Sequence, residues 1–223
     1  MRTHVFILPL MAAFGLSGCL GSGGGGGAAV GGGAAPAPAP APGGGAFATE
    51  LARVQALNPT LNMPTTINAT YRGQAQADLS DGGAVPVGQA TADLNLSLNW
   101  TDGGPMANVW SGNASNLRGT VNGTNFTSTG SIPVNGAISG VTRTPGLAGV
   151  VLGGLSVSLA GNMDIDDGTG PQSRTVGLGL GGNFYGNNAV AMTGPANLTI
   201  NGPAVGGAAG NLIGVGGQFY AEQ

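Results

Sequence analysis

The chain has 223 residues, of which 46 are glycine, 7% are charged and none is lysine. Its net charge of −3 offers no basic surface to neutralise phosphates, which argues against a nucleic-acid partner. Glycine costs about 1 kcal/mol per helical position relative to alanine, so the composition favours an all-β domain with many tight turns over a helical bundle.

Residues 1–18 have the features of a lipoprotein signal peptide. An apolar stretch from Val5 to Leu16 follows a short basic start, and it is shorter than the roughly 20 residues that span a bilayer. The stretch ends in Leu16-Ser17-Gly18-Cys19, which resembles the lipobox of bacterial lipoproteins, with small residues before the cleavage point and a thiol directly after it. Cys19 is the only cysteine in the chain and is therefore the expected lipid attachment site.

This expected anchor determines where the mature protein would work. Several acyl chains on one residue hold a protein at a membrane far better than a single chain does, so the membrane is an expected partner. Leu20 follows Cys19, at the position where an aspartate would resemble the signal that retains lipoproteins in the inner membrane. We therefore expect a lipid-anchored outer-membrane protein, and its periplasmic and surface-exposed orientations both stay open.

Two short segments connect the expected anchor to the folded body. Residues 19–46 consist of the anchoring cysteine and a run of almost only Gly, Ala and Pro. Such a run has no side chains that could form a core, and it is predicted to be a disordered linker. Residues 47–64 are predicted to be a lead-in with one short helix from Thr49 to Leu57, which Asn58-Pro59 ends.

Residues 65–223 are predicted to form a β domain. Leu94, Leu96 and Leu98 alternate with polar residues, which is typical of a half-buried strand. Long sequential strands with short connections favour an eight-stranded antiparallel up-and-down β-barrel, and a two-sheet sandwich is the alternative. The predicted strands cover residues 66–79, 89–100, 118–129, 132–142, 153–164, 174–185, 188–200 and 210–221.

Three segments of this domain resemble a known family. Residues 110–117 (WSGNASNL), 182–189 (GNFYGNNA) and 216–221 (GGQFYA) are similar, in this order, to segments of the β-barrel domain of transferrin-binding protein B and its relatives. The resemblance covers about residues 66–223 and implies a barrel in a surface lipoprotein. Asn187 replaces a proline of that family's signature, and the chain has no room for a handle domain or a second lobe. The transferrin-binding surface is therefore not carried over to this chain.

The mature chain is expected to have neither an enzymatic activity nor a cofactor. His4, the only histidine, would leave with the signal peptide, and Cys19 would carry lipid. The domain then lacks the His, Cys and Lys residues of nucleophilic triads, Schiff bases, and zinc or haem sites. Asp164, Asp166 and Asp167 could offer oxygen ligands to calcium, but they lack the spacing of an EF-hand loop, and a solvated hairpin turn is the preferred interpretation.

The remaining evidence on function comes from the two tryptophans and the fold. Trp100 continues an alternating apolar face and is predicted to fill the core, whereas Trp110 lies outside the predicted strands and is the candidate for ligand contact. The predicted function is non-enzymatic binding of a macromolecule or nutrient carrier by the loops of a monomeric barrel. Two alternatives stay open, a lipocalin-type barrel for a small solute and an eight-stranded transmembrane β-barrel.

Overall fold

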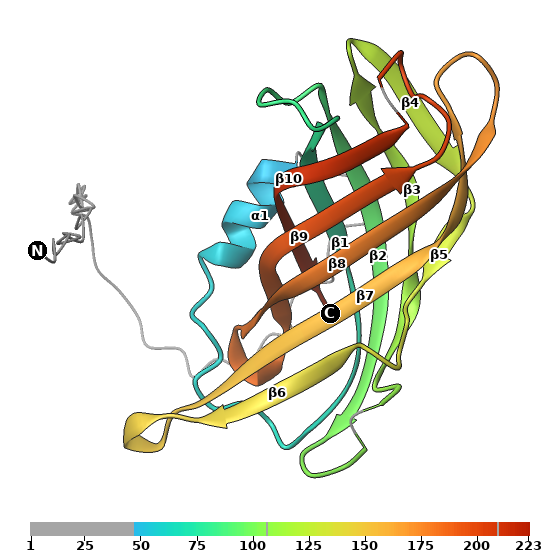
Figure 1. Ribbon diagram of the computed structural model, residues 1–223. Coiled ribbons are helices and arrows are strands. Elements are labelled where there is room, and N and C mark those ends of the chain that lie inside the picture. Colours follow the sequence, from blue (N-terminus) through green and yellow to red (C-terminus); the bar gives the residue numbers. More distant parts are fainter. Residues whose placement is uncertain (1–46, 106, 209) are drawn as a thin grey trace, which may run out of the picture. The chain divides into compact units, whose positions relative to one another are not determined.

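The computed structural model describes residues 47–105, 107–208 and 210–223. The predicted signal peptide and linker, with the lipobox and Cys19, lie outside these residues. The described part of the chain is mostly β-structure, and its ten strands form one antiparallel sheet (Figure 1). No helix in this part has the length and apolar character needed to cross a membrane.

Hydrogen-bonded pairing runs in a ring through eight strands. The ring closes because the first strand pairs with both the second strand and the last. In ring order these strands are β1 (Thr66–Ser80), β2 (Gly88–Thr101), β3 (Trp110–Val121), β4 (Thr124–Thr129), β7 (Val151–Asp166), β8 (Gln172–Tyr185), β9 (Ala191–Asn201) and β10 (Asn211–Glu222). Two short strands complete the sheet: β5 (Ser131–Pro133) pairs with β3, and β6 (Gly140–Pro145) pairs with β7.

The closed ring confirms the expected mostly β, antiparallel class, but the sheet is not a regular barrel. The irregularity lies between β3 and β7, where three short strands take the place of one long strand. β4 pairs with only three residues of β7, at Asp164, Ile165 and Asp166. β6 pairs with the opposite half of β7 and has no second partner strand among the described residues.

Two of the predicted strands are wrong in this irregular region. The predicted strand 118–129 contains a turn, because Asn122 and Gly123 have φ angles of 49° and 78° and connect β3 to β4 in a tight hairpin. The predicted strand 132–142 is interrupted after β5, because the chain turns at Asn135, whose carbonyl accepts a hydrogen bond from Ile138 N at 3.3 Å. The six other predicted strands correspond to β1, β2 and β7 to β10, within three residues at each end.

Alternate side chains of the strands point inward and form one core. An aromatic group lies inside it, with ring centroids of Tyr71 6.1 Å from Trp110 and 6.3 Å from Phe184. Each fully buried large apolar side chain stabilises the fold by roughly 1.5–3 kcal/mol relative to exposure. The core therefore holds the ring closed even where its hydrogen bonding is interrupted.

The sheet bends sharply where β8, β9 and β10 lie side by side. Gly182 and Gly194 face each other there, and a Cβ on either residue would overlap the backbone of the adjacent strand. Glycine is therefore required by the close approach of the strands, which a residue with a side chain would prevent. Next to this bend, the pairing of β10 with β9 shifts between Ile213 and Gln218.

The helix α1 (Phe47–Gln55) covers part of the outer face of β9 and β10 (Figure 1). It begins and ends two residues earlier than the sequence predicts. Leu51 and Val54 are buried in a small cluster with Ala191 and Tyr220, on the outside of the sheet. Phe47 adds a ring 5.6 Å from the Tyr220 ring. This packing gives the outer face of the sheet a second, local apolar cluster.

The lead-in after α1 crosses the end of the sheet at which β7 begins and β8 ends. Thr60 N donates to Phe184 O at 3.0 Å, and Met63 N donates to Val151 O at 2.9 Å. The Met63 side chain is buried in the core. The lead-in thus closes this end with backbone hydrogen bonds and one apolar side chain.

Candidate binding surfaces

One space identified inside the sheet offers little room for a ligand. A space beside Ala75, Ala92 and Leu178 measures about 10 Å³. A site for a single water molecule needs roughly 10–15 Å³ on the same measure. Side chains therefore fill this part of the interior, which is where a lipocalin-type barrel would hold its solute.

The outward face of the first strands is polar. On β2 the outward residues are Asp93, Asn95, Ser97 and Asn99, which alternate with buried leucines. Hydrogen bonds run from strand to strand over this face, such as Gln74 Nε2 to Asp93 Oδ1 at 3.0 Å. The Arg118 guanidinium donates to the same carboxylate oxygen, also at 3.0 Å. The face is thus a polar network and not an apolar band.

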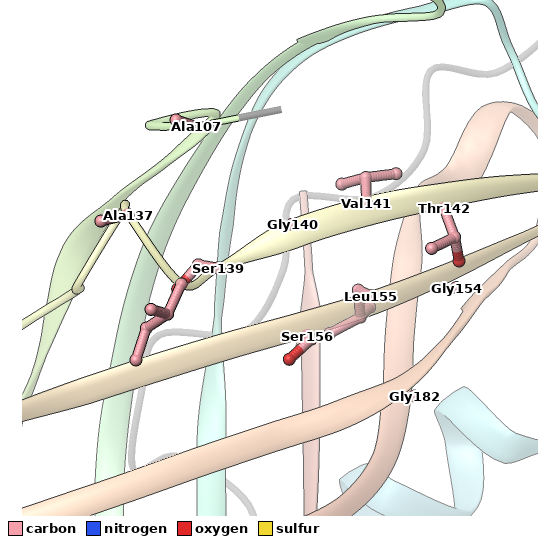
Figure 2. Close-up of a pocket in the computed structure, with 11 residues that line it drawn as sticks. Ala107, Ala137, Ser139, Gly140, Val141, Thr142, Gly154, Leu155, Ser156 and Gly182 are labelled. Atoms are coloured by element: carbon pink, nitrogen blue, oxygen red, sulfur yellow. The ribbon is translucent and has the colours of Figure 1, made fainter. Parts of the chain in front are cut away.

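A groove of about 510 Å³ lies beside β6, and we call it the β6 groove. It adjoins β6 at Gly140 to Thr142, β7 at Gly154 to Ser156, and Ala107 from the connection between β2 and β3 (Figure 2). Figure 2 shows Val141 and Thr142 on opposite sides of the β6 ribbon. Val141 is buried and Thr142 is exposed. Because glycines take part in the lining, backbone atoms are accessible in the groove.

Exposed apolar side chains surround the same strand. Ile138 precedes β6 and is 64% exposed, while Leu147 and Leu152 follow it and are 92% and 45% exposed. Leu61 is 55% exposed and lies beside the start of β7, where its carbonyl accepts from Val151 N at 2.8 Å. We call these four residues, Leu61, Ile138, Leu147 and Leu152, the apolar rim. Ile138 lies before one end of β6 and lines the β6 groove, whereas the other three residues lie around the other end. Exposed apolar residues close to one another are typical of a contact surface.

β6 also has one free edge. One edge of β6 pairs with β7, and no strand pairs with the other within the part of the chain that the structure describes. Trp110 Nε1 donates to Gly140 O at 3.1 Å, which uses one edge carbonyl. Arg143 donates from Nε to Met63 O at 3.2 Å and from Nη1 to Asp102 Oδ2 at 3.0 Å. These contacts fix the strand in place and still leave Thr142 and Thr144 exposed.

A second groove, of about 380 Å³, lies at the bend of β8, β9 and β10. Its lining includes Gln55 of α1, Asn183 and Tyr185 of β8, and Gln218 of β10. Amide side chains and exposed glycine backbone thus dominate it. It contains none of the four rim residues and shares only Gly182 with the β6 groove.

Trp110 does not lie on the surface, contrary to the expectation that it contacts a ligand from there. It begins β3, and its side chain is only 2% exposed. The indole packs against Tyr71 and donates to Gly140 O, so it supports β6 from inside. Trp100 is buried in the same core, as its alternating pattern predicts. The burial of Trp110 was not predicted because the predicted third strand begins at residue 118, eight residues after the start of β3.

Two of the three candidate calcium ligands, Asp166 and Asp167, lie at the hairpin turn between β7 and β8. Asp166 Oδ1 accepts from Gly168 N at 2.8 Å and from Gly170 N at 3.1 Å. Asp164 lies on β7 opposite Ser173 and is not part of the turn. The described residues contain no group of three or more acidic, His or Cys side chains that could hold a metal ion. The hydrogen bonds that Asp166 accepts, and the pairing of β7 with β8 on either side, agree with the preferred hairpin-turn interpretation.

Asp167, in the same turn, contacts a distant loop. Its Oδ2 accepts from Gly206 N at 2.8 Å, and its Oδ1 accepts from the Thr169 hydroxyl at 2.6 Å. The hydrogen bonds from the Thr169 hydroxyl and from Gly206 N lower the pKa of Asp167 to about 2. The carboxylate is thus fixed as a charged acceptor that holds the connection between β9 and β10. No spacing rule in the sequence links Asp167 to Gly206.

Two tyrosines near α1 and the last strand have raised pKa values. Burial raises the pKa of Tyr71 to about 12, and its hydroxyl donates to Ala189 O at 2.7 Å. Burial also raises the pKa of Tyr220 to about 12, where α1 covers the ring. Both hydroxyls are therefore neutral at physiological pH, and their surroundings indicate structural roles.

Comparisons of the chain with protein-family models, with curated proteins and with solved structures found no match.

Proposed function

We propose that this chain is an outer-membrane lipoprotein, anchored through Cys19, whose β domain is a non-enzymatic binding module for a macromolecule or nutrient carrier. The observation that carries the proposal is the combination found at β6. β6 has a free sheet edge and a groove of about 510 Å³ that Ile138 helps to line, and three further exposed apolar side chains lie around the end of the strand, at Leu61, Leu147 and Leu152. A protein partner that adds an extended segment to β6 gains backbone hydrogen bonds, and the apolar rim supplies buried area.

The resemblance to the barrel domain of transferrin-binding protein B supports a binding role of this kind. Its three segments fall on strands of the closed sheet: residues 110–117 on β3, residues 182–185 at the end of β8, and residues 216–221 on β10. In the proposal, the sheet is a variant of an eight-stranded up-and-down barrel whose fourth strand is broken into β4, β5 and β6.

The two alternatives have less support. A lipocalin-type barrel needs an interior cavity, and the space beside Ala75 holds at most a water molecule. A transmembrane barrel needs an outward apolar band, and the outward residues of β2 are Asp93, Asn95, Ser97 and Asn99. Apolar side chains that face outward, such as Ile213 and Val215 of β10, do not continue around the ring.

Site-specific photo-crosslinking tests the binding surface. A photo-reactive amino acid at Leu147, beside β6, should yield a defined adduct with the partner when intact cells that carry the variant are irradiated in their native medium. The same amino acid at Val85, which is 74% exposed in the connection between β1 and β2, is the matched control and should yield none. Adducts at both positions, or at Val85 alone, would contradict a partner site at β6.

The anchor is tested separately. Cys19→Ala should release the protein from the membrane fraction and abolish its labelling with a clickable fatty acid. Unchanged labelling would refute lipidation at Cys19. Protease shaving of intact cells then decides the orientation, since loss of the full-length protein indicates exposure at the surface and protection indicates the periplasm.

A further inference from the structure

Arg174 is a buried cation for which the described chain provides no counter-ion. It lies on β8 in the inward series with Val176 and Leu178, and it is only 2% exposed. Arg53, Arg118 and Arg143 each form an ion pair, and Arg72 is exposed. Arg174 is therefore the one described arginine that is buried without an ion-pair partner.

Most of the Arg174 guanidinium has no hydrogen-bond acceptor. Nη2 donates to Ala204 O at 2.6 Å, whereas Nε and Nη1 are buried and find no acceptor in the described chain. Guanidinium remains charged in proteins, so neutralisation does not relieve the cost of its burial. Buried donors of this kind are nearly always satisfied in folded proteins.

A second unsatisfied donor points into the same end of the interior. Ser128 on β4 faces inward, and its buried hydroxyl has no partner. Ser128 lies opposite Ile165 on β7, and Met163, two residues earlier on the inward face of β7, lies opposite Arg174. The sheet thus brings the hydroxyl and the guanidinium to adjacent rows at the end where β7 finishes and β8 begins.

The connection between β9 and β10 covers this end through its described residues 202–208. Val205 and Ala208 are buried in the core, and Val205 and Ala208 form an isolated bridge that folds the connection on itself. Asp167 Oδ2 holds Gly206 N from outside, at 2.8 Å. Asp167 attracts Arg174 but forms no ion pair with it. Its carboxylate is used by the turn and by Gly206, so it does not serve as the counter-ion.

We propose that Arg174 binds a small monovalent anion of halide size beneath residues 202–208, with the Ser128 hydroxyl as a further donor. The planar guanidinium presents pairs of parallel donors, and an anion in its plane accepts from Nη2 together with Nε or Nη1. The size is limited because Val205 and Ala208 already occupy the core at this end. The bound anion would balance the buried charge and fix the connection between β9 and β10. This inference does not depend on the function proposed for β6.

The first test measures thermal unfolding of the purified full chain at constant ionic strength, with sodium gluconate replaced stepwise by sodium chloride. Wild-type protein should show a saturable rise in Tm, of roughly 5–10 °C when chloride is about 100 times its dissociation constant. Arg174→Met should abolish the dependence on chloride. Arg72→Met removes an equal charge from an exposed site and should retain it. A wild-type Tm that does not respond to chloride, or an equal response in Arg174→Met, would overturn the proposal.

The second test locates the anion and applies even if Arg174→Met does not fold. Crystals of the wild-type protein grown with sodium bromide should show an anomalous bromide peak within hydrogen-bonding distance of Nη2 and of Nε or Nη1 of Arg174. A water molecule or a rearranged Asp167 carboxylate at that place, without bromide, would refute the proposed site.

Discussion

The guanidinium of Arg53 donates from Nη1 to Glu222 Oε1 at 2.9 Å, and it joins the first helix to the last strand. Arg53 also pairs with Glu50 within α1, and the hydrogen bond to Glu222 raises the pKa of Arg53. Beneath this ion pair, Leu51 and Val54 are buried against the sheet. The helix is therefore held by a half-exposed ion pair above an apolar contact.

The apolar contact should contribute more than the ion pair. Arg53→Met should reduce the free energy of unfolding by about 1 kcal/mol, because solvent screens the Arg53 guanidinium, which is 47% exposed. Val54→Ala should reduce it by about 2 kcal/mol, because two buried methyl groups are lost and a cavity remains. Urea unfolding of both variants measures the difference, and hydrogen exchange of the α1 amides shows whether the helix opens locally. A larger loss for Arg53→Met than for Val54→Ala would contradict this order.

The bend at Gly194 predicts a sharp difference between neighbouring glycines. A Cβ at Gly194 would overlap the Gly181 carbonyl oxygen, whereas a Cβ at Gly181 meets nothing within 4 Å. Gly194→Ala should therefore cost more than about 3 kcal/mol or prevent folding, as expected for overpacking against backbone. Gly181→Ala should be neutral or stabilising by up to about 1 kcal/mol, since it restricts the unfolded chain. Thermal unfolding of both variants decides, and equal effects would show that the bend relaxes.

Much of the fold could be predicted from the sequence, because most strands alternate strictly between core and solvent. β2 is the clearest example, with Leu94, Leu96 and Leu98 inward and Asn95 and Ser97 outward. The region from β3 to β6 could not be predicted from this alternation. β3 contains Asn116 in the left-handed region with a φ of 51°, close to where its pairing with β2 shifts register, so the inward series changes phase there. The turn after β3 did leave a signal, since Asn122-Gly123 is a favoured hairpin pair.

The candidate binding surface was less predictable than the fold. Whether Ile138 and Leu147 are exposed depends on β6 having only one partner strand, and pairing between strands distant in the sequence is not encoded by local spacing. The burial of Arg174 depends likewise on where residues 202–208 fold. Arg174 does occupy an inward position in the alternating pattern of β8, so this pattern could have predicted that a cation is buried there.

Alkaline pH should destabilise the protein through Tyr71 and Tyr220. Burial raises both pKa values from 10.0 to about 12. A folded pKa above the unfolded value means that the stabilisation is complete below pH 10 and is lost as pH rises through 12. For fully buried Tyr71 the loss is on the order of 2–3 kcal/mol, given 1.36 kcal/mol per pKa unit. Tyrosinate absorbance during a pH titration measures this.

Single substitutions assign the two titrations. Tyr71→Phe and Tyr220→Phe should each remove one component of the absorbance change near pH 12, and each variant should lose less stability than wild type between pH 10 and 12. Normal titration of both tyrosines in the folded protein, near pH 10, would contradict their burial.

Acid should weaken the hydrogen bond by which Asp167 holds the connection between β9 and β10 at Gly206. The hydrogen bonds from the Thr169 hydroxyl and Gly206 N lower the pKa of Asp167 from 3.8 to about 2. A folded pKa below the unfolded value means that the stabilisation is complete above pH 3.8 and is lost as pH falls through 2. The amide resonance of Gly206 should therefore shift with a midpoint near pH 2, because protonation weakens its acceptor.

Two variants separate this contact from a general effect of acid. Asp167→Asn should abolish the Gly206 transition, because the side chain no longer titrates. Asp81→Asn changes a turn carboxylate that accepts only from Gly83 N, at 3.2 Å, and should leave the transition in place. Release of residues 202–208 also opens the solvent route to Arg174, whose Nη2 donates to Ala204 O. Between pH 4 and 2, hydrogen exchange at Gly206 and Val205 should therefore accelerate in wild-type protein relative to the Asp167→Asn variant. An identical pH dependence in the two proteins would show that Asp167 does not hold this connection.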